Sequence, residues 1–169
     1  MSKLFGKIKD AKVTTQSEFL KEGTYWVHIS KVKEDETRNF DPFFAVEGKV
    51  VNVIDGGNEE KDNHFVGEEV SEFRSAKSDY FGQDVKRTVS AIMGRDPADI
   101  TEEIYNKIIG DTQPAKGIVV EYYIKNKALK NDATKFFSNV TCRRMVPKEE
   151  LTREVLEAVG EGNLSPIYG

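Results

Sequence analysis

The chain has 169 residues, a length that fits one domain, and its 10 Phe, 6 Tyr and 1 Trp argue for a folded protein. Apolar runs of only a few residues exclude a membrane span, and the first twelve residues lack the apolar stretch of a signal peptide, so we expect a cytoplasmic protein, in the host cytoplasm if viral. One cysteine and two histidines exclude an internal disulfide and a structural zinc site, and we expect no metal or cofactor.

The net charge of -4 argues against a protein that binds polyanions over its whole surface. The charge is unevenly distributed, because residues 111–147 carry seven cations against three anions and the remainder of the chain is correspondingly more acidic. One part of the surface can therefore attract phosphate.

Residues 1–22 are polar and lysine-rich and predict a flexible basic arm. The first strand follows, because core positions alternate with partly exposed ones: Tyr25, Val27 and Ile29 against Trp26, His28 and Ser30. A second strand is expected over 43–54, with Phe44, Val46 and Val50 on one side and Gly48 at a bulge or sharp bend. A third, acidic strand is expected over 66–73.

After the third strand, the spacing of the apolar residues changes to that of helices. A stripe of Phe81, Val85, Val89 and Ile92 predicts a helix with Asp79 as N-cap and Gly94 at its end, and Thr101 and Gly110 bound a second, short helix. Alternating residues predict two more strands over 117–125 and 134–144, joined as a hairpin by a basic loop. Pro147 and Gly160 bound a terminal helix.

This order is that of a mainly β, five-stranded Greek-key OB-fold barrel with a helical insertion between strands 3 and 4 and a C-terminal helix. The expected organisation is an arm over 1–22, the barrel over 23–146, the helix over 147–160 and a tail over 161–169. A mixed open sheet could carry the same order of elements.

The predicted hairpin carries the first candidate site. Its cations, together with one exposed aromatic from each of the pairs Tyr122/Tyr123 and Phe136/Phe137, are what sequence-independent binding of single strands requires. We expect Tyr123 and Phe137 to stack on bases, and the cations to be Lys125, Lys127, Lys130, Lys135 and Arg143. The alternative is a solvated hairpin tip with both aromatics packed under the terminal helix.

The outward side of the first two strands is the second candidate site, with Trp26, Phe43 and Lys49 as its ligand-binding residues and Arg38 and Phe40 nearby. The alternative for Trp26 is a core position with a satisfied indole N–H.

The sequence gives little support for an enzyme. Asp41 followed by Glu47-Gly48-Lys49 superficially resembles the carboxylates and lysine of a magnesium-dependent nuclease, but Asp41 is too near in sequence to lie on a separate strand, and Gly48 is better explained as a bulge. We therefore expect a non-catalytic protein.

Three stretches together resemble bacteriophage-encoded single-stranded DNA-binding proteins of the OB-fold type: residues 19–29, residues 44–50 and residues 135–140. The resemblance implies a protein that coats single strands, of DNA or alternatively RNA, during replication or recombination, and that contacts replication or recombination proteins. Many such proteins end in an acidic tail, which residues 162–169 lack.

The alternative function is that of a structural or assembly protein of a virus particle or replication complex. In that hypothesis the apolar stripe of the terminal helix docks on another subunit, which could also be a second copy of the chain. The stripe consists of Leu151, Val155, Leu156 and Val159.

Overall fold

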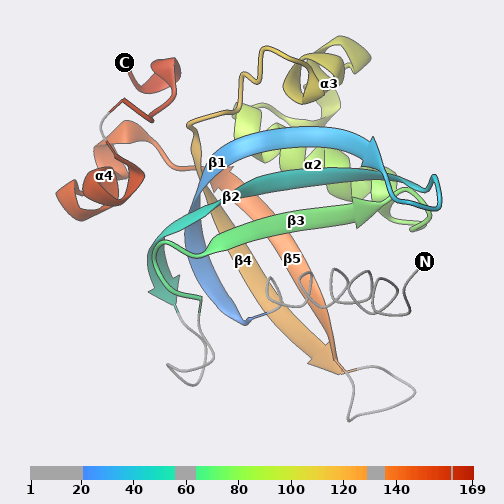
Figure 1. Cartoon of the computed structure of the whole chain (residues 1–169), viewed down its shortest axis with the longest axis horizontal. Coiled ribbons are helices and arrows are strands. Elements are labelled where there is room, and N and C mark those ends of the chain that lie inside the picture. Colours follow the sequence, from blue (N-terminus) through green and yellow to red (C-terminus); the bar gives the residue numbers. More distant parts are fainter. Residues whose placement is uncertain (1–20, 56–63, 129–135, 161) are drawn as a thin grey trace, which may run out of the picture.

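The computed structural model describes residues 21–55, 64–128, 136–160 and 162–169. They form a mainly β fold with five antiparallel strands in one sheet, whose order is β3-β2-β1-β4-β5 (Figure 1). The strands are β1 (Gly23–Glu36), β2 (Pro42–Asp55), β3 (Glu69–Ser75), β4 (Val119–Ala128) and β5 (Phe136–Met145). All five expected strands are thus confirmed, and the third begins three residues later than expected.

Three α-helices accompany the sheet in the described residues: α2 (Phe81–Met93), α3 (Glu102–Ile109) and α4 (Arg153–Val159). The hydroxyl of Thr101 caps α3 as expected. The residue at the N-cap of α2 is Tyr80 rather than the expected Asp79, and no side chain caps that helix. No described helix is long and apolar enough to cross a membrane.

β1 is the central strand and is sharply bent near its middle. Ser30 is skipped where Ile29 pairs with Gly48 and Lys31 pairs with Glu47, so the two strands form a bulge there. A Cβ on Gly48 would lie 2.5 Å from the carbonyl oxygen of His28, a distance that only glycine allows. The expected bend at Gly48 is confirmed.

The inward side of the curved sheet holds the main core. It contains the residues expected from alternation on β1 and β2, with Ile118, Val120, Tyr122 and Ile124 from the β4 region, and α2 adds its apolar stripe. This core fixes which residues of each strand face outward.

A polar network within this core joins β3 to α2, β4 and β5. The carboxylate of Glu72, 2% exposed, accepts hydrogen bonds from Tyr122 at 2.7 Å, Thr88 at 2.8 Å and Arg74 at 2.8 Å. Arg74 also donates to the backbone carbonyl of Val140 on β5. Burial raises the pKa of Tyr122 well above its ordinary value, so the phenol stays protonated and donates. The network links the two edge strands of the sheet.

A second, smaller core lies on the outward side, under residues 147–160 and 162–169, which we call the C-terminal segment. Its buried residues are Trp26, Val51, Val119, Val146, Leu151, Val155, Val159 and Tyr168. Figure 1 shows α4 and the C-terminus at one side of the sheet, apart from α2 and α3.

The expected start of the terminal helix is wrong. The helix does not begin at Pro147: a 3-10 turn (Lys148–Glu150) comes first, and the hydroxyl of Thr152 caps α4. The tail expected at the end of the chain is held on the sheet over residues 162–169, because the Tyr168 hydroxyl accepts from the Val119 N–H at 3.0 Å and donates to the Val146 carbonyl at 2.8 Å.

Candidate nucleic-acid interface

The outward side of β1, β2 and β3, beyond the C-terminal segment, forms one continuous surface that we call the β1–β3 outer face. Alternation along the three strands puts the following side chains on it: Lys31, Lys33, Phe43, Glu47, Lys49, Glu69, Ser71 and Phe73. The seven residues from Phe43 to Lys49 span about 20 Å of extended strand, enough for a few nucleotides of an extended single strand.

One end of this face carries an aromatic patch, formed by Phe43 and Phe73. Their ring centroids are 4.8 Å apart and both side chains are half-buried, so the pair is held on the sheet while part of its surface stays open. The ammonium of Lys33 lies 5.9 Å from the centroid of Phe43. In the adjoining turn, Phe40 is 78% exposed and has a φ of 64°. Such open rings are surfaces on which bases stack.

Cations and carboxylates alternate along the middle of the face. Lys33 forms an ion pair of 2.8 Å with Glu47, and the exposed Lys49 pairs in register with Glu69 on β3. The surface is therefore not uniformly basic. It offers ammonium groups to phosphates at intervals, with acceptors between them.

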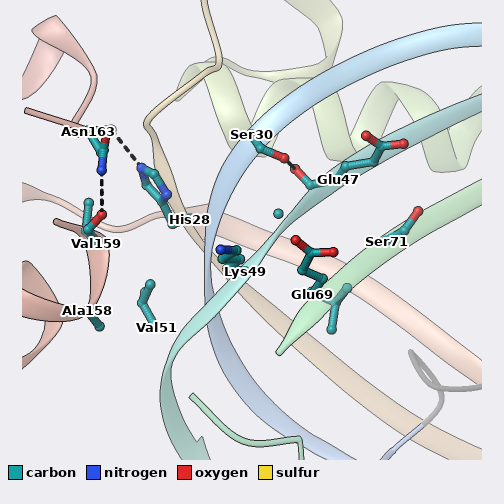
Figure 2. A pocket seen from close by; sticks show the side chains of 12 residues that line it. His28, Ser30, Glu47, Lys49, Val51, Glu69, Ser71, Ala158, Val159 and Asn163 are labelled. Carbon is teal, nitrogen blue, oxygen red and sulfur yellow. Dashed lines mark hydrogen bonds between the residues drawn. The ribbon is translucent and has the colours of Figure 1, made fainter. Parts of the chain in front are cut away.

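The other end of the face is a groove of about 590 Å³ that α4 closes on one side. Figure 2 shows Lys49 and Glu69 at its centre, with Val51 and Ala158 below them. His28 lines the groove next to Asn163, and its Nε2 is 2.8 Å from the backbone carbonyl oxygen of that residue. Because a carbonyl oxygen only accepts hydrogen bonds, the ring is the donor. The groove is thus built jointly by the sheet and the C-terminal segment.

Trp26 does not contribute to this surface, and the expectation that it is partly exposed is wrong. The side chain is 6% exposed, because Leu151, Val155 and Val159 pack with it in the second core. Its indole N–H donates to Glu121 at 3.2 Å. The alternative considered for this residue, a core position with a satisfied N–H, describes what the structure shows.

The hairpin of β4 and β5 retains part of its predicted site. Tyr122 is buried and Tyr123 faces outward, with the Arg143 guanidinium 4.0 Å from its ring centroid. Lys125 and Lys127 are exposed. Lys130 and Lys135 lie outside the described residues, as does the side chain of Phe137. Whether the hairpin binds nucleic acid stays a prediction.

The structure places the C-terminal apolar stripe differently from the assembly hypothesis. Leu151, Val155 and Val159 are buried against the chain's own sheet, and only Leu156, 39% exposed, faces outward. The stripe that was expected to dock on another subunit is therefore largely occupied within the chain.

The residues considered for a magnesium nuclease are not brought together as that reading requires. Asp41 lies at the β1–β2 turn, where it pairs with Lys77 at 3.0 Å, while Glu47 is six residues further along an extended strand. Within the described ranges, no group of three or more His, Cys, Asp or Glu side chains is arranged to hold a metal ion.

Phe73 is a candidate binding residue that the sequence analysis did not select. The structure turns Val70 and Glu72 inward and Phe73 outward. Residues 70, 72 and 74 share one side, but two of these three residues are charged, so the strand lacks the apolar side that alternation normally reveals.

Comparison with known proteins gives no family for the chain: no protein-family model matches it, and no curated protein matches it significantly.

Proposed function

We propose that the chain is a non-catalytic protein that binds single-stranded DNA along the β1–β3 outer face, by stacking bases on aromatic rings and contacting phosphates with lysines. In this proposal it coats single strands during replication or recombination, in a bacteriophage context. The observation that carries the proposal is the open Phe43–Phe73 pair, which lies beside Lys33 on an extended, unpaired sheet face.

Unpaired bases are the ligand that these side chains fit. A ring can stack on a base only when the base has left the double helix, and each such contact contributes about 1–3 kcal/mol. Duplex binding without base contacts relies on a dense array of phosphate contacts. The alternation of Lys33, Glu47, Lys49 and Glu69 supplies no such array.

The finer part of the fold proposal is an OB-fold barrel. The order β3-β2-β1-β4-β5 leaves β3 and β5 as the two edges that would meet on closure, and the Arg74 side chain already connects β3 to Val140 on β5. Helices between β3 and β4 fit the same fold. OB-folds bind oligonucleotides on their strand 2–3 face and the loops beside it, which corresponds to the β1–β3 outer face here.

The test is a titration of labelled single-stranded oligonucleotide of mixed sequence, followed by fluorescence anisotropy at low and moderate salt, with matching duplex as control. We expect single strands to bind more tightly than duplex, with an affinity that falls as salt rises. Trp26 fluorescence should change little on binding, because the indole is covered by the C-terminal segment. Absence of single-strand binding at low salt would overturn the proposal.

A further inference from the structure

We propose that the groove between the β1–β3 outer face and α4 takes one unstacked nucleobase of the bound strand and prefers guanine, recognised by Glu69 and Lys49. This inference rests on the proposed function and adds a base preference to it. It starts from the feature that stacking alone does not use, a groove of about 590 Å³ with both charged and apolar walls.

The shape and lining of the groove suit a flat, polar-edged ring. Val51, Ala158 and Val159 supply an apolar wall against which a base can lie, and Lys49, Glu69 and Ser71 bring polar groups to the opposite side (Figure 2). Binding sites for small ligands commonly combine an apolar lining with a few placed polar groups.

Three other polar side chains of the groove are already committed to the chain itself. Glu47 forms an ion pair with Lys33, and His28 donates to Asn163. The Ser30 hydroxyl donates to the Glu47 carbonyl at 3.0 Å. Among the residues that the structure describes, the side chains of Lys49 and Glu69 make no hydrogen bond or ion pair. These are therefore the two charged groups available to a base, with the neutral Ser71 hydroxyl beside them.

Their placement matches the edge of guanine. Lys49 and Glu69 are direct cross-strand partners, so their side chains leave the sheet about 5 Å apart and point the same way. Guanine presents two neighbouring donors, N1–H and N2–H, beside the acceptor O6. A carboxylate, which only accepts, can take both donors, while an ammonium, which only donates, contacts O6.

The other bases satisfy this pair less well. Thymine flanks its single N3–H with two carbonyl oxygens, which a carboxylate repels. Adenine and cytosine each offer one amino group to Glu69, without a second donor beside it. The expected preference therefore has guanine first and thymine last.

The experiment compares three labelled oligothymidylates of about twelve nucleotides, a length within the site sizes of single-strand binders, that carry guanine, hypoxanthine or thymine at the centre. We expect the guanine strand to bind about tenfold more tightly than the thymine strand, with hypoxanthine, which lacks the N2 amino group, between them. In Glu69→Gln the preference should fall to about twofold or less. The matched control Glu102→Gln, which removes the same charge from exposed α3, should keep the full preference.

The outcomes separate this inference from the proposed function. Equal binding of all three strands by the unmodified protein overturns the guanine preference and leaves single-strand binding intact. Failure to bind any of them overturns the proposed function itself. A preference that survives in a folded Glu69→Gln also overturns the assignment to Glu69. The comparison of the three strands needs no variant, so it decides the preference even if Glu69→Gln does not fold.

Discussion

Two aromatic positions on the outward side of the same sheet, Trp26 on β1 and Phe43 on β2, have opposite surroundings. Trp26 lies under the C-terminal segment within a second core, whereas Phe43 lies at the uncovered end of the sheet beside Phe73 and Lys33. Strand alternation assigns both to the same side of the sheet, but it does not tell which part of that side another segment covers. One face can therefore serve stability at one end and binding at the other.

The largest effect is expected at the end of the sheet that the C-terminal segment covers. Trp26→Ala removes a large side chain from a packed core and leaves a cavity, so we expect the free energy of unfolding to fall by about 3–5 kcal/mol. Urea denaturation followed by far-ultraviolet circular dichroism measures this, since the variant has no tryptophan left. Fully folded Trp26→Ala should still bind single strands, and a selective loss of binding without loss of stability would show that Trp26 is a ligand residue after all.

At the open end the expected effect falls on binding instead. Phe43→Ala should weaken single-strand binding by about 1–3 kcal/mol, the contribution of one stacked base, and should cost less stability than Trp26→Ala. Anisotropy titration measures the first quantity and urea denaturation the second.

Phe65→Ala is the matched control, because Phe65 is also an exposed phenylalanine, 64% exposed, but lies between β2 and β3 and outside the β1–β3 outer face. Its affinity should equal that of the unmodified protein. If Phe65→Ala weakened binding as much as Phe43→Ala, the effect would reflect general hydrophobic contact and not the aromatic patch.

The C-terminal segment, which covers Trp26, is held in place by the hydroxyl of Tyr168 as well as by apolar packing. Tyr168→Phe leaves the buried Val119 N–H and Val146 carbonyl without this partner, so we expect a loss of about 1–3 kcal/mol in unfolding free energy. Tyr80→Phe changes an exposed tyrosine in the same way and should have no comparable effect. Equal stability of Tyr168→Phe and the unmodified protein would mean that residues 162–169 do not hold the C-terminal segment in place.

The sequence predicted the strands, the two helices between β3 and β4, and the inward sides of β1 and β4, because period-two and period-three-to-four patterns come directly from local backbone geometry. It also predicted the bend at Gly48. These features depend on neighbours in the chain, and the structure confirms them.

What it missed depends on contacts between distant segments. The inward position of Glu72 follows from partners on α2 and β4 that no local pattern reveals, and with it the outward position of Phe73. The burial of Trp26 likewise requires residues more than a hundred positions away. The buried Glu72 contradicts the simple assignment of polar side chains to solvent, and Trp26 is buried because a distant segment covers its side of the sheet.

The smallest expected effect concerns the pH dependence of the ion pair that holds the C-terminal segment to β5. Arg144 donates to both carboxylate oxygens of Glu150, at 2.7 and 2.9 Å, and this hydrogen bonding lowers the pKa of Glu150 below its ordinary value of 4.5. Because the pKa is lower in the folded state than in the unfolded state, the pair stabilises the fold fully above pH 4.5, and this contribution is lost as the pH falls through the lowered pKa. Glu121 also faces Arg144, at 3.2 Å, and keeps it in place.

Glu150→Gln removes the charged partner at every pH, so its urea midpoint should lie slightly below that of the unmodified protein at neutral pH. Well below pH 4.5 the two midpoints should converge, because Glu150 is then protonated and resembles the amide. Trp26 emission reports the same transition at the C-terminal segment itself, since the indole is exposed to water only when that segment leaves the sheet. If the difference between the two urea midpoints stayed constant with pH, the effect of Glu150→Gln would not come from the lost charge. The C-terminal segment would then be held at this point by packing alone.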